Sequence, residues 1–290
     1  MALSHRSLLF ALVSCLGSAP GTAQQTQIAD STLDVGGAHL RYRVGGHGAP
    51  VVLIHGFAGN ANDLAAVRSA LSSSHMTVSV EIRGFGQTSG PLSAAGADTA
   101  IVEDIARVMA HLRIERADVV GFSMGAVLAA RLAVLHPSRV HSLVLVSAAP
   151  MLMGPAHAFW DPVADDLEHG RGIATLVRAT TPIGTALPDD STVAQASRQS
   201  IGTHETGAWA AIARGMPGLT LSPTELRRLT TRVLIVYGAN DPLMRGHGEW
   251  ANELPNAQID TVANANHAST RLAPEFLRMT ERFVDSRGAP

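Results

Sequence analysis

A serine in a tight, glycine-flanked turn is the residue of this 290-residue chain best suited to chemistry. The turn, Gly121-Phe122-Ser123-Met124-Gly125, follows an apolar run at 117–120 and precedes a helical pattern over 126–135. The glycines relieve crowding around a strained serine backbone, so the Ser123 hydroxyl can project from the top of a sheet beside a helix N-terminus. This strand, turn and helix, a nucleophile elbow, is typical of acyl transfer.

A serine hydroxyl needs a base and an acid that orients the base, and the chain offers both in the order Ser, Asp, His. Asp241 follows the β-branched run 232–238, and His267 follows a weaker run, 257–262. We therefore expect both side chains at the sheet edge that carries Ser123. Taken alone, Asp241 could close an Asx turn before proline, and His267 could be a solvated loop residue. Their order and their positions after strands favour a catalytic triad.

The other histidines suit a catalytic role less well. The chain contains 13 histidines. We interpret His55, which precedes a glycine, as a residue that braces a loop beneath the site. His247 follows Asp241 too closely to come from a different strand end. No H-x-H or H-E-x-x-H spacing occurs, so the sequence predicts no metal site and no cofactor.

Two further motifs make the chain resemble the α/β-hydrolase superfamily from about Leu40 to the C-terminus. The segment His55-Gly56-Phe57-Ala58-Gly59 is similar to the family's H-G-x-x-G oxyanion loop. The segment 81–89, read E-I-R-G-F-G-Q-T-S, is similar to its D-x-R-G-x-G-x-S segment. The resemblance implies an α/β fold with a mostly parallel central sheet, flanking helices and a helical cap insertion.

The resemblance also implies a role for each site residue. Ser123 would be the nucleophile, His267 the base and then the acid, and Asp241 the orienting acid. The backbone N–H groups of Phe57 and Met124 would form the oxyanion hole.

Three positions depart from the family's pattern. Glu81 replaces an aspartate, which affects a structural hydrogen bond of its loop. Asn266 replaces the glycine that commonly precedes the histidine, so we expect Asn266 to adopt a positive φ. Leu64 stands where many relatives carry tryptophan, so we expect it to alter the pocket wall.

The N-terminus predicts export. Residues 1–23 combine Arg6, an apolar core at 8–16 and small residues before Gln24, as in a secretory signal peptide cleaved after Ala23. The apolar run is too short to span a membrane. A lipobox reading with Cys15 lipidated is the alternative. We expect a secreted or periplasmic protein without disulfides, because Cys15 is the only cysteine.

Composition excludes several kinds of partner. The formal net charge is −2, and loss of Arg6 with the leader makes it −3. Only 16% of residues are charged and no basic cluster occurs, so neither nucleic acid nor an anionic membrane is an expected partner. The expected partner is a small, apolar, ester-like molecule.

The spacing of apolar residues predicts further elements of the chain. The segment 32–44 predicts a hairpin, 99–112 a helix and 141–146 a strand. We expect a signal peptide at 1–23, a hydrolase core at 24–150 and 223–290, and a helical cap at 151–222. Apolar residues of the cap could line a cavity, or could pack between helices and core: Met151, Met153, Phe159, Trp160, Trp209 and Met216.

The sequence thus predicts a secreted serine hydrolase that cleaves a carboxylic ester through an acyl-enzyme on Ser123. A lactonase and a C–C bond hydrolase of the same fold stay open as alternatives. A non-catalytic protein that binds a small ligand also stays open. Ser123 argues against dehalogenases and epoxide hydrolases, which use an aspartate nucleophile.

Overall fold

The computed structural model describes residues 28–90, 99–148, 156–202, 204, 206–243, 253–254 and 256–286. The predicted leader, with Cys15 and the cleavage site after Ala23, lies outside these ranges. Met151, Met153 and His247 also lie outside them.

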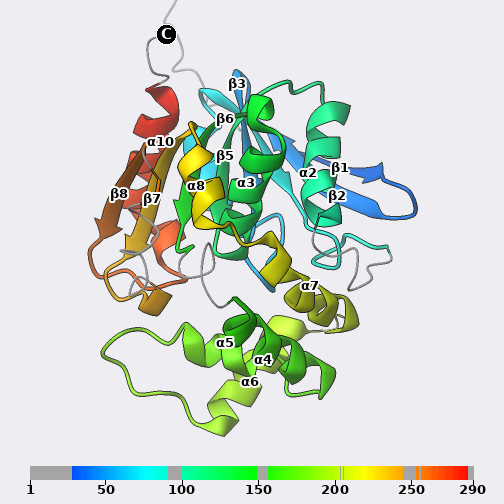
Figure 1. The fold of residues 1–290 in the computed structure, drawn as a ribbon, viewed down its shortest axis with the longest axis vertical. Coiled ribbons are helices and arrows are strands. Elements are labelled where there is room, and N and C mark those ends of the chain that lie inside the picture. Colours follow the sequence, from blue (N-terminus) through cyan, green and yellow to red (C-terminus); the bar gives the residue numbers. More distant parts are fainter. Residues whose placement is uncertain are drawn as a thin grey trace, which may run out of the picture.

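The centre of the molecule is an eight-stranded sheet in the order β1-β2-β4-β3-β5-β6-β7-β8 (Figure 1). β2 pairs antiparallel with β1 and β4, and the other neighbouring pairs are parallel. This confirms the predicted fold class. The strands are β1 Ala29–Asp34, β2 His39–Gly45, β3 Ala49–Ile54, β4 His75–Val80, β5 Ala117–Phe122, β6 Val140–Val146, β7 Arg232–Gly238 and β8 Ala257–Val262.

Helices cover both faces of the sheet. α2, α3 and α8 lie on one face, and α1 and α10 lie on the other (Figure 1). The helices are α1 Ala65–Leu71, α2 Ala100–His111, α3 Met124–Leu135, α4 Ala156–Glu168, α5 Ala174–Ala179, α6 Asp190–Ile201, α7 Thr206–Leu219, α8 Pro223–Arg228 and α10 Pro274–Asp285. The short 3₁₀ helix η2, Pro137–Arg139, follows α3, and the short 3₁₀ helix η4, Thr270–Leu272, precedes α10.

The central strands are apolar because helices cover them on both sides. Every residue of β5 is buried, as are the last four residues of β3. The helix predicted at 99–112 is confirmed by α2, and the hairpin predicted at 32–44 is confirmed by the antiparallel pair β1 and β2. The hairpin turns at Gly36 and Gly37, whose φ angles of 68° and 90° suit glycine.

The helices α4 to α6 lie beyond the sheet edge at which the parallel strands end (Figure 1). α4 packs against α7. Trp160, Trp209 and Met216 are at most 1% exposed and belong to the main apolar cluster. Of the two roles considered for these three side chains, the structure shows packing. The division of the chain into core and cap stays a prediction.

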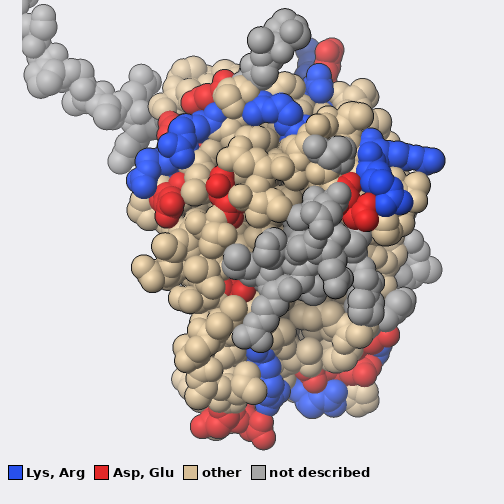
Figure 2. Space-filling view, turned by 60° about the vertical axis from the view of Figure 1, so that its left-hand side comes forward, with Lys and Arg blue, Asp and Glu red and all other residues tan. Residues whose placement is uncertain are grey.

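Charged side chains are distributed in small groups of both signs on the face that Figure 2 shows. Within the described ranges, no helix is both long and apolar enough to cross a bilayer. The same ranges contain no group of three or more His, Cys, Asp or Glu side chains placed to hold a metal ion.

Candidate active site

Ser123 occupies the sharp turn between β5 and α3. Its φ and ψ of 53° and −116° lie where L-residues are rarely found. The Ser123 N–H donates a hydrogen bond to the Val146 carbonyl, 2.8 Å away, which ties the turn to β6. A strained backbone held in this way fixes the direction in which the hydroxyl points.

The two glycines of the motif allow this turn to pack. A Cβ atom at Gly121 would collide with the backbone of Gly125 and Ala126 at the start of α3. A Cβ atom at Gly125 would collide with the carbonyl groups of Ile54 and His55 at the end of β3. Both glycines are therefore required by close backbone contacts, as the sequence predicts for an elbow.

The structure brings Ser123, His267 and Asp241 together. The His267 Nε2 atom lies 3.1 Å from Ser123 Oγ, and His267 Nδ1 lies 3.2 and 3.3 Å from the two Asp241 carboxylate oxygens. All three residues are buried: Ser123 is 4% exposed, His267 is 7% exposed and Asp241 is 0% exposed. This arrangement lets a neutral His267 accept the Ser123 proton while Asp241 accepts the hydrogen bond from Nδ1.

Asp241 performs both roles that the sequence left open. Its N–H donates to the Gly238 carbonyl at 3.0 Å, and its Oδ1 accepts the Leu243 N–H at 2.9 Å, as in an Asx turn. The same carboxylate faces His267. The turn therefore orients the acid rather than competing with that orientation.

The prediction of a positive φ at Asn266 is wrong. Asn264, two residues earlier, has the positive φ of 58°. Asn266 Oδ1 instead accepts the N–H groups of Ala268 and Ser269, at 3.1 and 2.9 Å. Asparagine thus stabilises the loop with its side chain where the family's glycine would act through its backbone.

The predicted oxyanion residues lie beside the serine. A Cβ atom at Gly56 would lie 3.4 Å from Ser123 Cβ, which places the loop of Phe57 against the elbow. Met124 is the first residue of α3, where backbone N–H groups have no acceptor within the helix. These positions are compatible with two N–H donors for a carbonyl oxygen, and the assignment to Phe57 and Met124 stays a prediction.

Buried polar groups brace the loop that carries Phe57. His55 is buried between Gly56 and Ile82: Nε2 accepts the Ile82 N–H at 2.9 Å, and Nδ1 lies 2.7 Å from the Gly56 carbonyl. Burial lowers the pKa of His55, so the ring is neutral at pH 7 and Nδ1 carries the proton. His55 therefore braces the loop, as we interpreted it, and takes no part in the triad.

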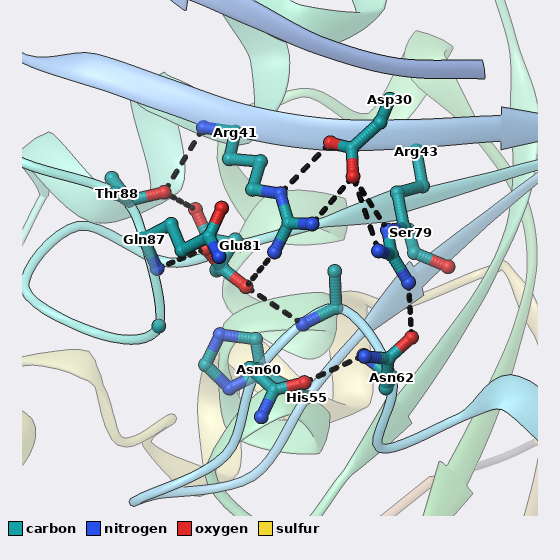
Figure 3. Close-up of polar contacts among 12 residues, drawn as sticks. Asp30, Arg41, Arg43, His55, Asn60, Asn62, Ser79, Glu81, Gln87 and Thr88 are labelled. Carbon is teal, nitrogen blue, oxygen red and sulfur yellow. Dashed lines mark hydrogen bonds and ion pairs between the residues drawn. The ribbon is translucent and has the colours of Figure 1, made fainter.

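Glu81 fixes the same loop from the other side (Figure 3). Its Oε1 accepts the Ala61 N–H at 3.1 Å and its Oε2 accepts the Gln87 N–H at 2.6 Å. Arg68 donates to the Ala61 carbonyl at 3.0 Å, so both ends of this residue are held. A Cβ atom at Gly86 would collide with the Glu81 carboxylate, so glycine there leaves room for glutamate.

Glu81 is fully buried, and Arg41 supplies the nearby positive charge. Arg41 Nη1 lies 3.6 Å from Glu81 Oε1 (Figure 3). On its outer side Arg41 donates from Nε to Asp30 at 2.8 Å, and this hydrogen bond holds the pKa of Asp30 at about 2. The resulting chain of charges runs from the exposed hairpin to the loop beside Ser123.

We expect Glu81→Gln to destabilise the fold by about 3 kcal/mol, because one carboxamide oxygen cannot serve both the Ala61 and the Gln87 N–H groups. Urea unfolding followed by circular dichroism measures this loss. The exposed Glu115→Gln variant removes the same charge and should stay within about 0.5 kcal/mol of the native chain. Equal stability of the two variants would contradict a bracing role for Glu81.

A cleft of about 290 Å³ opens onto the triad. Ser123, His267 and Phe122 lie on one side of it, with the loop residues 57–59. Ile173, Leu176 and Val177, from α5 and the residue before it, give it an apolar wall, while Asp63 and Arg271 contribute charge. Leu64 belongs to the apolar cluster beneath α1 and is not a cleft residue, so the expectation that it shapes the pocket wall is wrong.

Sequence reasoning missed most of the cleft wall. The α5 residues form a plain apolar pattern, and no motif distinguishes the side of α5 that faces the serine. Arg271 is the one residue that the sequence could have indicated. It follows His267 by only four positions, in the 3₁₀ helix η4 that comes directly after the loop of His267.

Comparison with known proteins identifies the family. A family model described as alpha/beta hydrolase fold matches residues 49–171. The dihydrolipoyllysine-residue acetyltransferase component of the acetoin cleaving system of Cupriavidus necator is 32% identical over 250 residues. That match covers 81% of this chain and 63% of the relative, so the chain spans less than two thirds of the relative's length.

Two other relatives are matched over most of their length. A 2-hydroxymuconate semialdehyde hydrolase of Pseudomonas putida is 26% identical, covering 82% of this chain and 88% of that protein. A pimeloyl-[acyl-carrier protein] methyl ester esterase of Nitrosomonas europaea is 27% identical, covering 85% and 97%.

The solved structures agree on the fold. The enol-lactonase of Burkholderia xenovorans LB400 superposes with a TM-score of 0.73 at 21% identity, covering 88% of this chain and 99% of that one. Together, the sheet topology, the family model and the relatives show that this chain belongs to the α/β-hydrolase superfamily.

Proposed function

We propose that the protein is a serine hydrolase that cleaves a carboxylic ester of a small, largely apolar substrate through an acyl-enzyme on Ser123. The observation that carries the proposal is the buried hydrogen-bonded chain from Ser123 Oγ through His267 to Asp241. It meets the geometric requirement for a nucleophile, its base and the group that orients the base.

The proposed reaction follows from this geometry. His267 Nε2 takes the Ser123 proton as the hydroxyl oxygen attacks the ester carbonyl, and Asp241 stabilises the imidazolium that forms. Negative charge develops on the carbonyl oxygen, where the N–H groups of Phe57 and Met124 would donate. One such donor contributes about 3 kcal/mol to the transition state. His267 then protonates the leaving alcohol, and a water molecule activated by the same histidine releases the acid.

The cleft supports a small substrate. Its 290 Å³ lies at the lower limit of the roughly 300–1,000 Å³ found for small-molecule sites. Ile173, Leu176 and Val177 offer apolar contact to an acyl chain or an alcohol. The relative named as a methyl ester esterase also supports an ester as the substrate.

Lactonase activity is the second candidate, since the enol-lactonase shares the fold and a lactone is an internal ester open to the same attack. C–C bond cleavage is the third. A non-catalytic binding protein is the alternative that the buried triad disfavours.

We propose that helices α4 to α7 act as a cap, because α5 and α6 residues face Ser123 across the cleft. We also propose that the protein is exported through the leader at residues 1–23.

The test is hydrolysis of p-nitrophenyl esters of increasing acyl length by the mature protein, with fluorophosphonate labelling beside it. We expect turnover of short acyl groups, a decline once the chain exceeds the cleft, and stoichiometric labelling of Ser123. Labelling without ester turnover would favour the lactonase or C–C hydrolase. A folded protein with neither signal would contradict the serine hydrolase and favour a binding protein.

A further inference from the structure

One cationic side chain stands in the cleft beside the triad. Arg271 lies in η4, half-buried, and lines the same cleft as Ser123 and His267. The catalytic chemistry proposed above does not use it. Its position therefore calls for a separate explanation.

The guanidinium is held firmly in place. Its Nε donates to the Asp63 carbonyl at 3.0 Å and its Nη1 donates to the Ala268 carbonyl. The Arg271 Cζ atom stacks 4.7 Å from the centre of the Phe122 ring, and that ring lies 5.2 Å from the centre of the His267 ring. The cation is thus fixed one aromatic ring away from the base, with little rotamer freedom left to lose on binding.

The charge of Arg271 has no counter-ion within the described residues. Its hydrogen bonds go to two backbone carbonyls, and it makes no ion pair with a carboxylate in the described ranges. Asp63 also lines the cleft, but its carboxylate is packed against the backbone of Gly59. By contrast, the buried Arg83 is paired with Asp104 at 2.8 Å.

An unpaired, half-buried guanidinium is complementary to an anion. Arginine binds carboxylates with paired, charge-assisted hydrogen bonds, and such bonds gain strength where water is partly excluded. The opposite wall of the cleft, formed by α5, is apolar. A ligand that fits both features has an apolar body and one carboxylate.

We propose that the substrate of this site is an ester that carries a free carboxylate and that Arg271 binds this carboxylate. This inference rests on the proposed hydrolysis at Ser123. Arg271 then determines specificity: it selects anionic esters over neutral ones of the same shape, and the ester carbonyl lies at Ser123 while the carboxylate lies beside the Arg271 guanidinium.

Two matched substrate pairs test the proposal. The first pair is the p-nitrophenyl monoester of glutarate and p-nitrophenyl pentanoate, which differ in a carboxylate on the acyl side. The second pair is 4-acetoxybenzoate and its methyl ester, which differ in a carboxylate on the leaving group. For each pair the ratio of kcat/KM, anionic over neutral, is measured in the native chain and in variants.

We expect Arg271→Gln to lower this ratio about 10- to 100-fold for at least one pair, the effect of one charge-assisted hydrogen-bond pair. Arg271→Lys keeps the charge and should retain part of the preference. Arg278→Gln removes an exposed arginine of α10 and should leave the ratio unchanged. Because the ion pair is partly exposed, the preference should also decrease as salt is added. If Arg271→Gln changes neither ratio while the esters are hydrolysed, the inference is wrong and the proposed function stands.

A binding measurement separates the two proposals if no ester is hydrolysed. Calorimetry with the folded Ser123→Ala protein compares monomethyl glutarate with dimethyl glutarate. Tighter binding of the monoester that disappears in the Ser123→Ala, Arg271→Gln double variant would support the anion site and leave only the proposed ester hydrolysis refuted. Equal binding of both ligands would refute the anion site. Melting temperatures of the Arg271 variants check that the loop at Asp63 stays folded.

Discussion

Replacing Ser123 with alanine is expected to lower kcat for any ester substrate by about 10⁶-fold while the protein stays folded. The loss is large because no other group can take the place of the attacking oxygen 3.1 Å from His267. Fluorophosphonate labelling should disappear together with turnover. A variant that retained more than about 1% of the native rate would show that the reaction does not pass through Ser123.

The same residue allows a stability test that is independent of activity. Alanine keeps the strained φ of 53°, whereas glycine adopts this conformation readily. Backbone strain of this kind costs about 1–3 kcal/mol, and the greater flexibility of glycine in the unfolded chain offsets part of that gain. We expect Ser123→Gly to be about 1 kcal/mol more stable than Ser123→Ala by urea unfolding, although both are inactive. Equal stability would argue against strain at the elbow.

The relative positions of the catalytic candidates could be predicted because parallel strands end at one edge of the sheet. Ser123, Asp241 and His267 each follow a strand, so their distance in sequence does not matter once β5, β7 and β8 are aligned. The order Ser, Asp, His and the position of each residue after a strand were therefore enough to predict that the three side chains lie close together, and the structure places them within hydrogen-bonding distance.

The cleft wall was less predictable because residue type alone does not decide where a helix directs its side chains. The sequence left two roles open for the large aromatic residues of the segment between β6 and β7: they could line a cavity or pack between helices and core. Trp160 and Trp209 pack against Phe57 in tilted and edge-to-face contacts, with ring centres 5.4 and 5.9 Å from that of Phe57. Smaller residues of α5 face the serine instead. Aromatic rings bury the most apolar area in the core, and this outweighs a role in the cleft.

The loop before His267 shows a second limit of the sequence. A positive φ was required near this position, and asparagine was the expected residue, but the chain contains both Asn264 and Asn266. In the structure the Asn266 side-chain oxygen accepts the Ala268 and Ser269 N–H groups, and Asn264 takes the left-handed conformation. Sequence predicted the kind of residue and not its position.

The second large effect is expected for Asp241→Asn, which should lower kcat about 10⁴-fold with little change in folding. The Leu243 N–H explains why an asparagine amide should be unable to orient His267 correctly. Its N–H donates to Asp241 Oδ1 at 2.9 Å, so an asparagine oxygen would be retained at that position as the acceptor. The amide NH₂ group would then face His267 Nδ1, now 3.2 Å from the second carboxylate oxygen.

An NH₂ group at that position cannot accept a hydrogen bond from Nδ1. It favours the tautomer in which Nδ1 accepts and Nε2 carries the proton, so Nε2 can no longer take the proton of Ser123. Ester turnover and the rate of fluorophosphonate labelling should fall in parallel, since both depend on this base, while the melting temperature stays close to that of the native chain. A rate within tenfold of native would mean that a different acid orients His267.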